Sequence, residues 1–176
     1  MNLGSFVDAA REIVGWHEIA PGAYARWLWG DRDLGVNPYG CADAANILYT
    51  IGDFPRGDGE RAAFVCAMRG MQDAQTGLFG ESTHHTIHTT AHVLAALELF
   101  DAGPSYGLAA LEPYRAPEGL EGFLDGLNWG DPWSMSHRGA GIYAAMAIAG
   151  ESTFEWEQAY FAWLRREADP ATGLWR

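Results

Sequence analysis

Arg69-Gly-Met-Gln-Asp73-Ala-Gln-Thr76-Gly77-Leu78-Phe79 is a stretch that recurs, with substitutions, later in this chain of 176 residues. Its second copy reads Arg165-Arg-Glu-Ala-Asp169-Pro-Ala-Thr172-Gly173-Leu174-Trp175, and a shorter version reads Asp125-Gly-Leu-Asn-Trp129. The closing aromatic residues, Phe79, Trp129 and Trp175, are spaced by 50 and then 46 residues. A period of roughly 20 to 50 residues is typical of repeat architectures. The sequence therefore predicts repeated units, each closed by a turn that ends on an aromatic residue.

Three segments rich in alanine repeat with nearly the same period and are predicted to be inner helices. They are residues 45–52, 91–98 and 140–147, spaced by 46 and 49 residues. Small and apolar side chains nearly all round a helix indicate burial on most sides. The segments between them mix apolar residues at helical spacing with charged ones, which indicates half-exposed outer helices. These outer segments are residues 59–74, 117–127 and 153–168, and Thr153 is predicted to cap the last of them. The predicted fold is therefore all-α, with about three helix pairs.

Two stretches resemble known families. The stretch from Gln72 to Leu97 contains a Gln, a Gly-aromatic turn and an inner helix with a Thr and Ala-Leu pattern, and it resembles the repeats of terpenoid cyclases and protein prenyltransferases. The ending from Asp169 to Trp175 also resembles turns of six-hairpin glycan hydrolases and lyases. The resemblance covers most of the chain and implies an α/α toroid, with catalytic groups near the starts of the inner helices.

The number of helix pairs bears on the domain organisation. Residues 1–176 are predicted to form one α/α-toroid-like domain, but a closed ring of six pairs needs more units than this chain holds. We therefore expect an incomplete or open ring: a fragment, an open arc, or a half-ring that a second copy completes as a homodimer. Exposed apolar repeat faces need such a cap or partner.

Composition excludes several classes of partner. The formal net charge of -12 repels phosphate backbones, so nucleic acid is not an expected partner. No apolar run reaches the roughly 18 residues that span a bilayer, and the first residues lack the pattern of a signal peptide. A cytoplasmic location is predicted. Of the two cysteines, Cys41 and Cys66, the second is predicted to be a buried core thiol, and no disulfide is expected.

Alignment of the repeats predicts a polar stripe that faces the axis of the toroid. Its equivalent positions are Ala42, His88 and His137, then Asn46, His92 and Gly141 one turn later, then Tyr49, Ala95 and Ala144. Imidazole and carboxylate groups suit acid–base chemistry near neutral pH. The candidate catalytic residues are therefore His88, His92, His137 and Asp43.

The histidines allow two other interpretations. His88 and His92 have the i, i+4 spacing of two metal-binding imidazoles, but Thr89 occupies the position of the zincin glutamate. Cys41, Asp43 and His88 lie where prenyltransferases hold zinc, although Cys-x-Asp reverses the order of that family. No cofactor and no metal ligands are predicted, and zinc is left open as the alternative. In the second of these interpretations, the histidines form hydrogen-bonded links between packed helices. We assign this structural role to His84 and His85.

A loop rich in aromatic and polar residues, 128–138, is the second candidate site. Its alternative role is structural, with Asp131 or Ser136 capping the next helix. The candidate substrate-binding residues are Tyr39, Asn46, Tyr49, Trp129, Trp133 and Arg138.

Three functions are weighed on these residues. The first is an enzyme related to terpenoid cyclases and prenyltransferases that acts on a small molecule in a central cavity, although the Asp-x-Asp-Asp cluster of class II cyclases is absent. The alternatives are a glycan-active hydrolase or lyase, which would bind a glycan ligand, and a non-catalytic helical-repeat scaffold.

Overall fold

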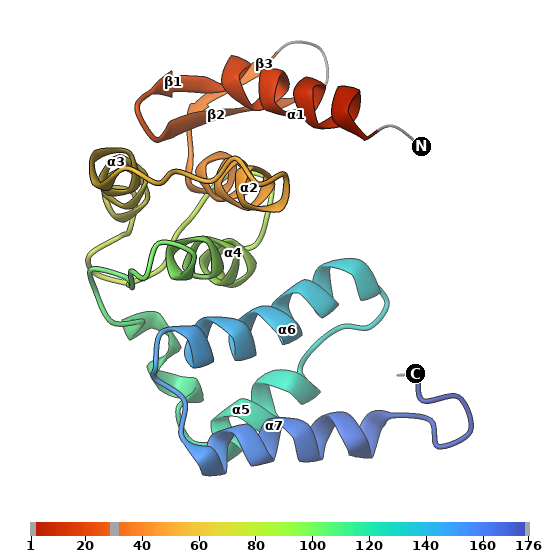
Figure 1. Cartoon of the computed structure of the whole chain (residues 1–176). Coiled ribbons are helices and arrows are strands. Elements are labelled where there is room, and N and C mark those ends of the chain that lie inside the picture. Colours follow the sequence, from red (N-terminus) through yellow and green to blue (C-terminus); the bar gives the residue numbers. More distant parts are fainter. Residues whose placement is uncertain (1–2, 29–31, 175–176) are drawn as a thin grey trace.

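The computed structural model describes residues 3–28 and 32–174 and is mostly helical, as the sequence predicts (Figure 1). The elements, in chain order, are α1 (Gly4–Trp16), β1 (Glu18–Ala20), β2 (Ala23–Leu28), β3 (Arg32–Val36), α2 (Pro38–Thr50), α3 (Asp58–Arg69), α4 (Thr86–Glu98), the 3-10 helix η1 (Ala109–Tyr114), α5 (Pro117–Asp125), α6 (Pro132–Ile148) and α7 (Phe154–Glu167). Trp175, the last aromatic residue of the repeat, lies outside the described residues.

The three predicted inner helices, α2, α4 and α6, lie in a row through the molecule (Figure 1). Helix α4 is the middle member, because it packs against α2 on one side and α6 on the other. Val93, Leu94 and Leu97 of α4 are fully buried, as are Ile142 and Met146 of α6. The alanine-rich composition thus corresponds to helices that are surrounded by other helices.

The three predicted outer helices are α3, α5 and α7. Helix α3 contacts α2 and α4, whereas α5 packs against α7 and η1. On α7, Trp156 and Trp163 are buried, and their indole N–H groups donate to the carbonyl of Tyr114 and the carboxylate of Asp125. Thr153 caps α7 by accepting from the N–H of Trp156, as predicted from the sequence.

The two copies of the repeated turn have the same backbone structure. Asp73 accepts from the backbone N–H groups of Gln75 and Thr76, and Asp169 accepts from that of Ala171. Each turn closes on a glycine in the left-handed region, with φ of 74° at Gly77 and 72° at Gly173. The repeat seen in the sequence is therefore a structural repeat.

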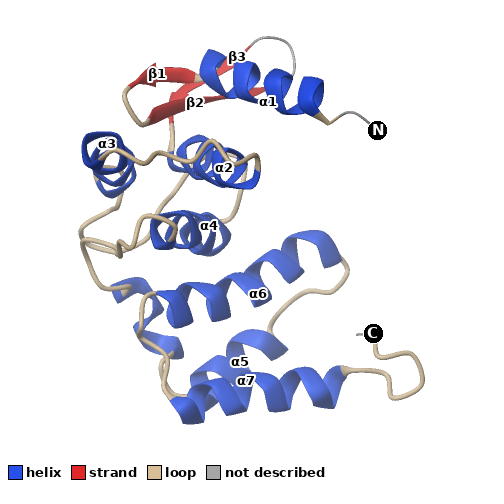
Figure 2. Cartoon of the chain, viewed as in Figure 1, coloured by secondary structure: helices blue, strands red, loops and turns tan. Residues whose placement is uncertain are grey.

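The all-α prediction is wrong for the first part of the chain. Strands β1, β2 and β3 form an antiparallel sheet in that order, and β2 packs against α2 and α3 (Figure 2). The strands are only three to six residues long and belong to no repeat unit, so helical periodicity could not reveal them. Gly40 allows α2 to approach β2 closely, because a Cβ at this position would lie 2.9 Å from the carbonyl oxygen of Ala25.

The predicted burial of Cys66 is also wrong. Cys66 is exposed, because the buried face of α3 carries Phe64 and Met68, and a residue midway between them on a helix points to the opposite side. Cys41 is the buried cysteine. None of the helices in the described part of the chain combines the length and the apolar character needed to cross a membrane.

Candidate functional site

The starts of α2, α4 and α6 bring a group of polar and aromatic side chains together. Each start is fixed by a side-chain cap: Asn37 accepts from the N–H of Gly40, His85 from that of Ile87, and Asp131 from that of Ser134. These caps place Tyr39 in the first turn of α2, His88 in the first turn of α4, and Trp133 at the start of α6. We call the cluster of Arg26, Tyr39, Asp43, Glu81, His84, His88, His92, Trp133 and His137 the histidine cluster.

Tyr39 lies at the centre of the histidine cluster. Its ring stacks on His84, with centroids 4.3 Å apart and an interplanar angle of 8°, and it lies 4.3 Å from the ring of His92. The guanidinium of Arg26 is 4.3 Å from the same ring centroid. The Tyr39 hydroxyl is 3.2 Å from Nε2 of His88. The Tyr39 side chain thus links helix α2 to strand β2, to the loop before α4 and to α4 itself.

His88 and His137 extend the cluster toward α6. Their rings are stacked 4.2 Å apart at an angle of 8°, and Trp133 packs edge-on against His137 at 4.6 Å. Trp133 is 73% exposed, so most of this indole faces solvent beside the imidazoles. An exposed aromatic face next to hydrogen-bonding groups is suited to binding a ring-shaped polar ligand.

Two carboxylates each pair with one imidazole of the cluster. Asp43 Oδ1 is 2.9 Å from His92 Nε2, and Glu81 Oε1 is 2.9 Å from His84 Nδ1. The two carboxylates differ in access, because the side chain of Asp43 is 43% exposed and that of Glu81 only 2%. Burial opposes ionisation of Glu81, but hydrogen bonds from Thr83 and His84 outweigh it and lower its pKa.

The protonation states of Tyr39 and His88 follow from their surroundings. Burial, reinforced by the neighbouring His137, His84 and His92, lowers the pKa of His88 to about 4, so its imidazole is neutral near pH 7. Burial and the charge of Asp43 raise the pKa of Tyr39, so its hydroxyl keeps its proton. In the tautomer of neutral His88 that carries its proton on Nδ1, the hydroxyl of Tyr39 donates to Nε2. A neutral base and a proton donor stand side by side.

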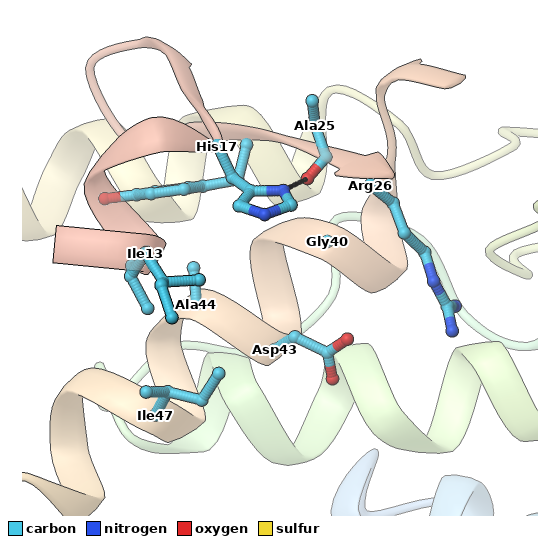
Figure 3. Close-up of a pocket in the computed structure, with 10 residues that line it drawn as sticks. Ile13, His17, Ala25, Arg26, Gly40, Asp43, Ala44 and Ile47 are labelled. Carbon is cyan, nitrogen blue, oxygen red and sulfur yellow. Dashed lines mark hydrogen bonds between the residues drawn. The ribbon is translucent and has the colours of Figure 1, made fainter. Parts of the chain in front are cut away.

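A pocket of about 240 Å³ adjoins the histidine cluster (Figure 3). It lies between α1, β2 and α2, and its walls are mainly apolar, with Ile13 and Ile47 on one side. Arg26 and Asp43 lie on the other side (Figure 3). Because Arg26 and Asp43 belong to the cluster as well, the pocket and the cluster share two charged residues.

The structure brings six of the ten predicted site residues together. These are Tyr39, Asp43, His88, His92, Trp133 and His137. Arg26 and Glu81, which the sequence analysis missed, come from a strand and from the loop before α4 rather than from the predicted stripe. His84, expected to be only a link between helices, stacks on Tyr39 inside the cluster. His85, predicted to link two helices, instead caps α4 by accepting from the N–H of Ile87.

The other four predicted residues lie outside the histidine cluster. The amide of Asn46 donates to the carbonyl of Ala42 in its own helix, and Tyr49 packs edge-on against Phe54. Trp129 lines a separate apolar cavity near Tyr160 and Trp163, and the guanidinium of Arg138 lies over the ring of Phe123.

The zinc alternative depended on Cys41, Asp43 and His88 lying together. The thiol of Cys41 is instead buried against β2, where its sulfur accepts from the N–H of Tyr24, while Asp43 pairs with His92. Across residues 3–28 and 32–174, no group of three or more His, Cys, Asp and Glu side chains is arranged to hold a metal ion.

Comparisons of the chain with known proteins found no relative. No family model matches it, and no match was found among curated proteins or solved structures. The function therefore has to be inferred from the geometry of the histidine cluster.

Proposed function

We propose that the histidine cluster is the active site of a lyase that cleaves a uronate-containing glycan by general acid–base catalysis. The observation that carries this proposal is the hydrogen bond of 3.2 Å between the Tyr39 hydroxyl and Nε2 of a neutral His88. It supplies a proton acceptor and a proton donor at adjacent atoms, which elimination across two neighbouring carbon atoms requires.

The reaction is balanced by these two residues. His88 removes the proton on the carbon next to the uronate carboxylate, the bond from the neighbouring carbon to the glycosidic oxygen breaks, and a carbon–carbon double bond forms. Tyr39 gives its proton to the departing oxygen. The proton on His88 then passes to the Tyr39 oxygen across their hydrogen bond, which restores both groups.

Arg26 and Asp43 have supporting roles in this proposal. The guanidinium of Arg26, held over the Tyr39 ring, is positioned to neutralise the uronate carboxylate and the negative charge that develops on it. Asp43 orients the imidazole of His92, which packs against the same ring. The exposed Trp133 offers a stacking surface for a neighbouring sugar.

Elimination is favoured over hydrolysis by the burial of Glu81. Glycoside hydrolysis generally uses two carboxyl groups that flank the scissile bond. Asp43 is accessible, but the side chain of Glu81 is 2% exposed and is held by Thr83 and His84, so it is unsuited to reach a substrate. Terpenoid-cyclase chemistry has less support, because it needs clustered acidic groups in an apolar cavity, whereas the histidine cluster contains four imidazoles and two carboxylates that lie against different imidazoles.

The toroid relationship is part of the same proposal. The inner helices α2, α4 and α6 lie in a row, and the outer helices α3, α5 and α7 alternate with them along the chain. We place them in an open arc of the α/α-toroid type, with the histidine cluster at the starts of the inner helices.

The test uses polygalacturonate, alginate and hyaluronan as substrates and follows the ultraviolet absorbance of the new double bond conjugated to the carboxylate. Tyr39→Phe and His88→Ala are expected to lower kcat roughly 10²- to 10⁴-fold. Tyr49→Phe is the matched control, because it removes an exposed tyrosine hydroxyl outside the cluster and should leave kcat unchanged. Release of reducing sugar without the absorbance, or full activity of Tyr39→Phe, would contradict the lyase proposal.

A further inference from the structure

We infer that the pocket between α1, β2 and α2 binds a neutral aryl group that carries a hydroxyl, of about the size of phenol. The inference rests on the proposed function in one respect, since the aryl group would be a substituent of the same glycan substrate. The binding itself follows from the pocket and can be measured without any turnover.

The size and lining of the pocket point to a single ring. An apolar cavity of about 150 Å³ is enough to bind benzene, and sites for drug-sized ligands begin at about 300 Å³. The pocket, at about 240 Å³, lies between these sizes. Its lining includes the aliphatic side chains of Val14, Ala44 and Ile47 and the rings of Tyr24 and His17. Such walls favour an apolar or aromatic group over a sugar ring.

The exposed rim of the pocket gives a second reason. Ile13 and Ile47 line it, yet they are 49% and 40% exposed in the absence of an occupant. A ring placed between them would remove apolar surface from water on both sides, which favours binding. Burial of the exposed surface of Ile13 and Ile47 would therefore stabilise an aromatic ring bound in the pocket.

Asp43 determines the polar part of the ligand. Its Oδ1 is engaged by His92, whereas Oδ2 has no hydrogen bond among the described residues, and the side chain is 43% exposed. A carboxylate accepts hydrogen bonds and repels anions, so a hydroxyl donor suits this end of the pocket better than a carboxylate. Arg26, on the same side, is assigned to the uronate carboxylate in the proposed reaction, which leaves Asp43 as the polar partner for the group in the pocket. A neutral phenol-like group fits both the apolar walls and this acceptor.

The position of the pocket connects it with the proposed reaction. Asp43 faces the pocket and also pairs with His92, which contacts the ring of Tyr39. An aryl substituent in the pocket would therefore hold the attached sugar beside the Tyr39–His88 pair. Substrates that carry an aryl group are expected to have a lower KM than the same glycan without it.

Binding of phenol and of toluene to the full chain, measured by saturation-transfer NMR and calorimetry, tests the inference. Phenol is expected to bind saturably and more tightly than toluene, and Asp43→Asn should reduce that preference. Ala44→Leu fills the pocket and is expected to weaken phenol binding at least tenfold.

Two further variants separate loss of the pocket from loss of the fold. Ile13→Ser removes part of the rim and should weaken phenol binding severalfold, whereas Ile19→Ser is the control, because Ile19 is 52% exposed and does not line the pocket. Circular dichroism confirms that each variant is folded. Equal phenol affinity in Ile13→Ser and Ile19→Ser, or no saturable binding to the unmodified protein, overturns the inference. Phenol binding without lyase activity would instead overturn only the proposed function.

Discussion

At the scale of single residues, His88 is the most informative group in the chain. It contacts rings from three other segments: Tyr39 of α2, His84 of the loop before α4, and His137 of α6. Charging this imidazole would place a cation among other imidazoles and remove an acceptor from the Tyr39 hydroxyl. The sequence alone identified His88 as a candidate, but its neutral state is a consequence of the packing around it.

The pKa of His88 predicts how stability depends on pH. The pKa of about 4 in the folded protein is below the ordinary histidine pKa of 6.5, so between these values the unfolded chain binds more protons than the folded one. Stability from this group is therefore fully present above pH 6.5 and is lost as the pH falls toward 4. The charge of Glu81 raises the pKa of His88, whereas the nearby His84, His92 and His137 lower it.

Urea unfolding at pH 7 and pH 4.5 measures this effect. The unmodified protein is expected to lose more stability between the two pH values than a His88→Gln variant, which keeps a polar side chain but has no group that titrates. Equal losses in the two proteins would show that His88 does not carry the dependence.

At the scale of elements, the two copies of the repeated turn can be compared directly, because they have similar backbone angles but different surroundings. Gly77 and Gly173 have nearly the same positive φ, 74° and 72°. They differ in their surroundings, because a Cβ at Gly77 would overlap the carbonyl oxygen of Gly107, whereas no described residue has an atom within 4 Å of a Cβ at Gly173. Gln72 fixes the first turn against this neighbouring segment through bonds to Tyr106 and Ser105.

Alanine at each glycine separates backbone strain from crowding. Gly173→Ala should cost only the strain of a left-handed alanine, about 1–2 kcal/mol of the free energy of unfolding. Gly77→Ala should cost distinctly more, because segment 103–108 must also move. Thermal and urea unfolding of both variants give the comparison, and equal costs would mean that the contact with Gly107 is unimportant.

The elements also show what periodicity can and cannot predict. All six repeat helices were predicted, and so was the N-cap of α7, because helical spacing and capping depend on residues within a few positions of one another. The sheet was missed because its strands are short and are stabilised by pairing and by packing against α2. Helix α2 illustrates the limit within an element: Asn46 lies on the predicted stripe, but its amide donates to the carbonyl of Ala42 in its own helix instead of joining the cluster.

At the scale of the whole molecule, helix α4 connects the two halves of the chain. It packs against α2, which carries the sheet, and against α6, which leads to the pair α5 and α7. Leu94 is fully buried in the middle of this arrangement. We therefore expect the described elements to unfold together, because loss of α4 would expose the facing sides of both of its neighbours.

Truncation of Leu94 tests this cooperativity. Leu94→Ala is expected to lower the free energy of unfolding by about 2–5 kcal/mol. If the elements unfold together, the transitions followed by circular dichroism and by tryptophan fluorescence should stay coincident. The comparison is informative because Trp156 and Trp163, which are buried, lie on α7 and not on the helix that carries Leu94. Separate transitions would indicate two independently stable halves.

The homodimer inferred from the incomplete ring stays a prediction, which sedimentation equilibrium tests.

The sequence by itself determined the helices, the cap of α7 and the closing turns, since each of these depends on neighbouring residues along the chain. The recurrence of these patterns gave the repeat period. It also supplied most of the candidate site, because His88 and His92 share one face of one helix. Only the tertiary structure decided that Arg26 and Glu81 join these histidines and that Tyr49 and Arg138 do not. The physical reason is that the rotation and offset of one helix against its neighbours are set by how the buried side chains pack together, and no local pattern records that.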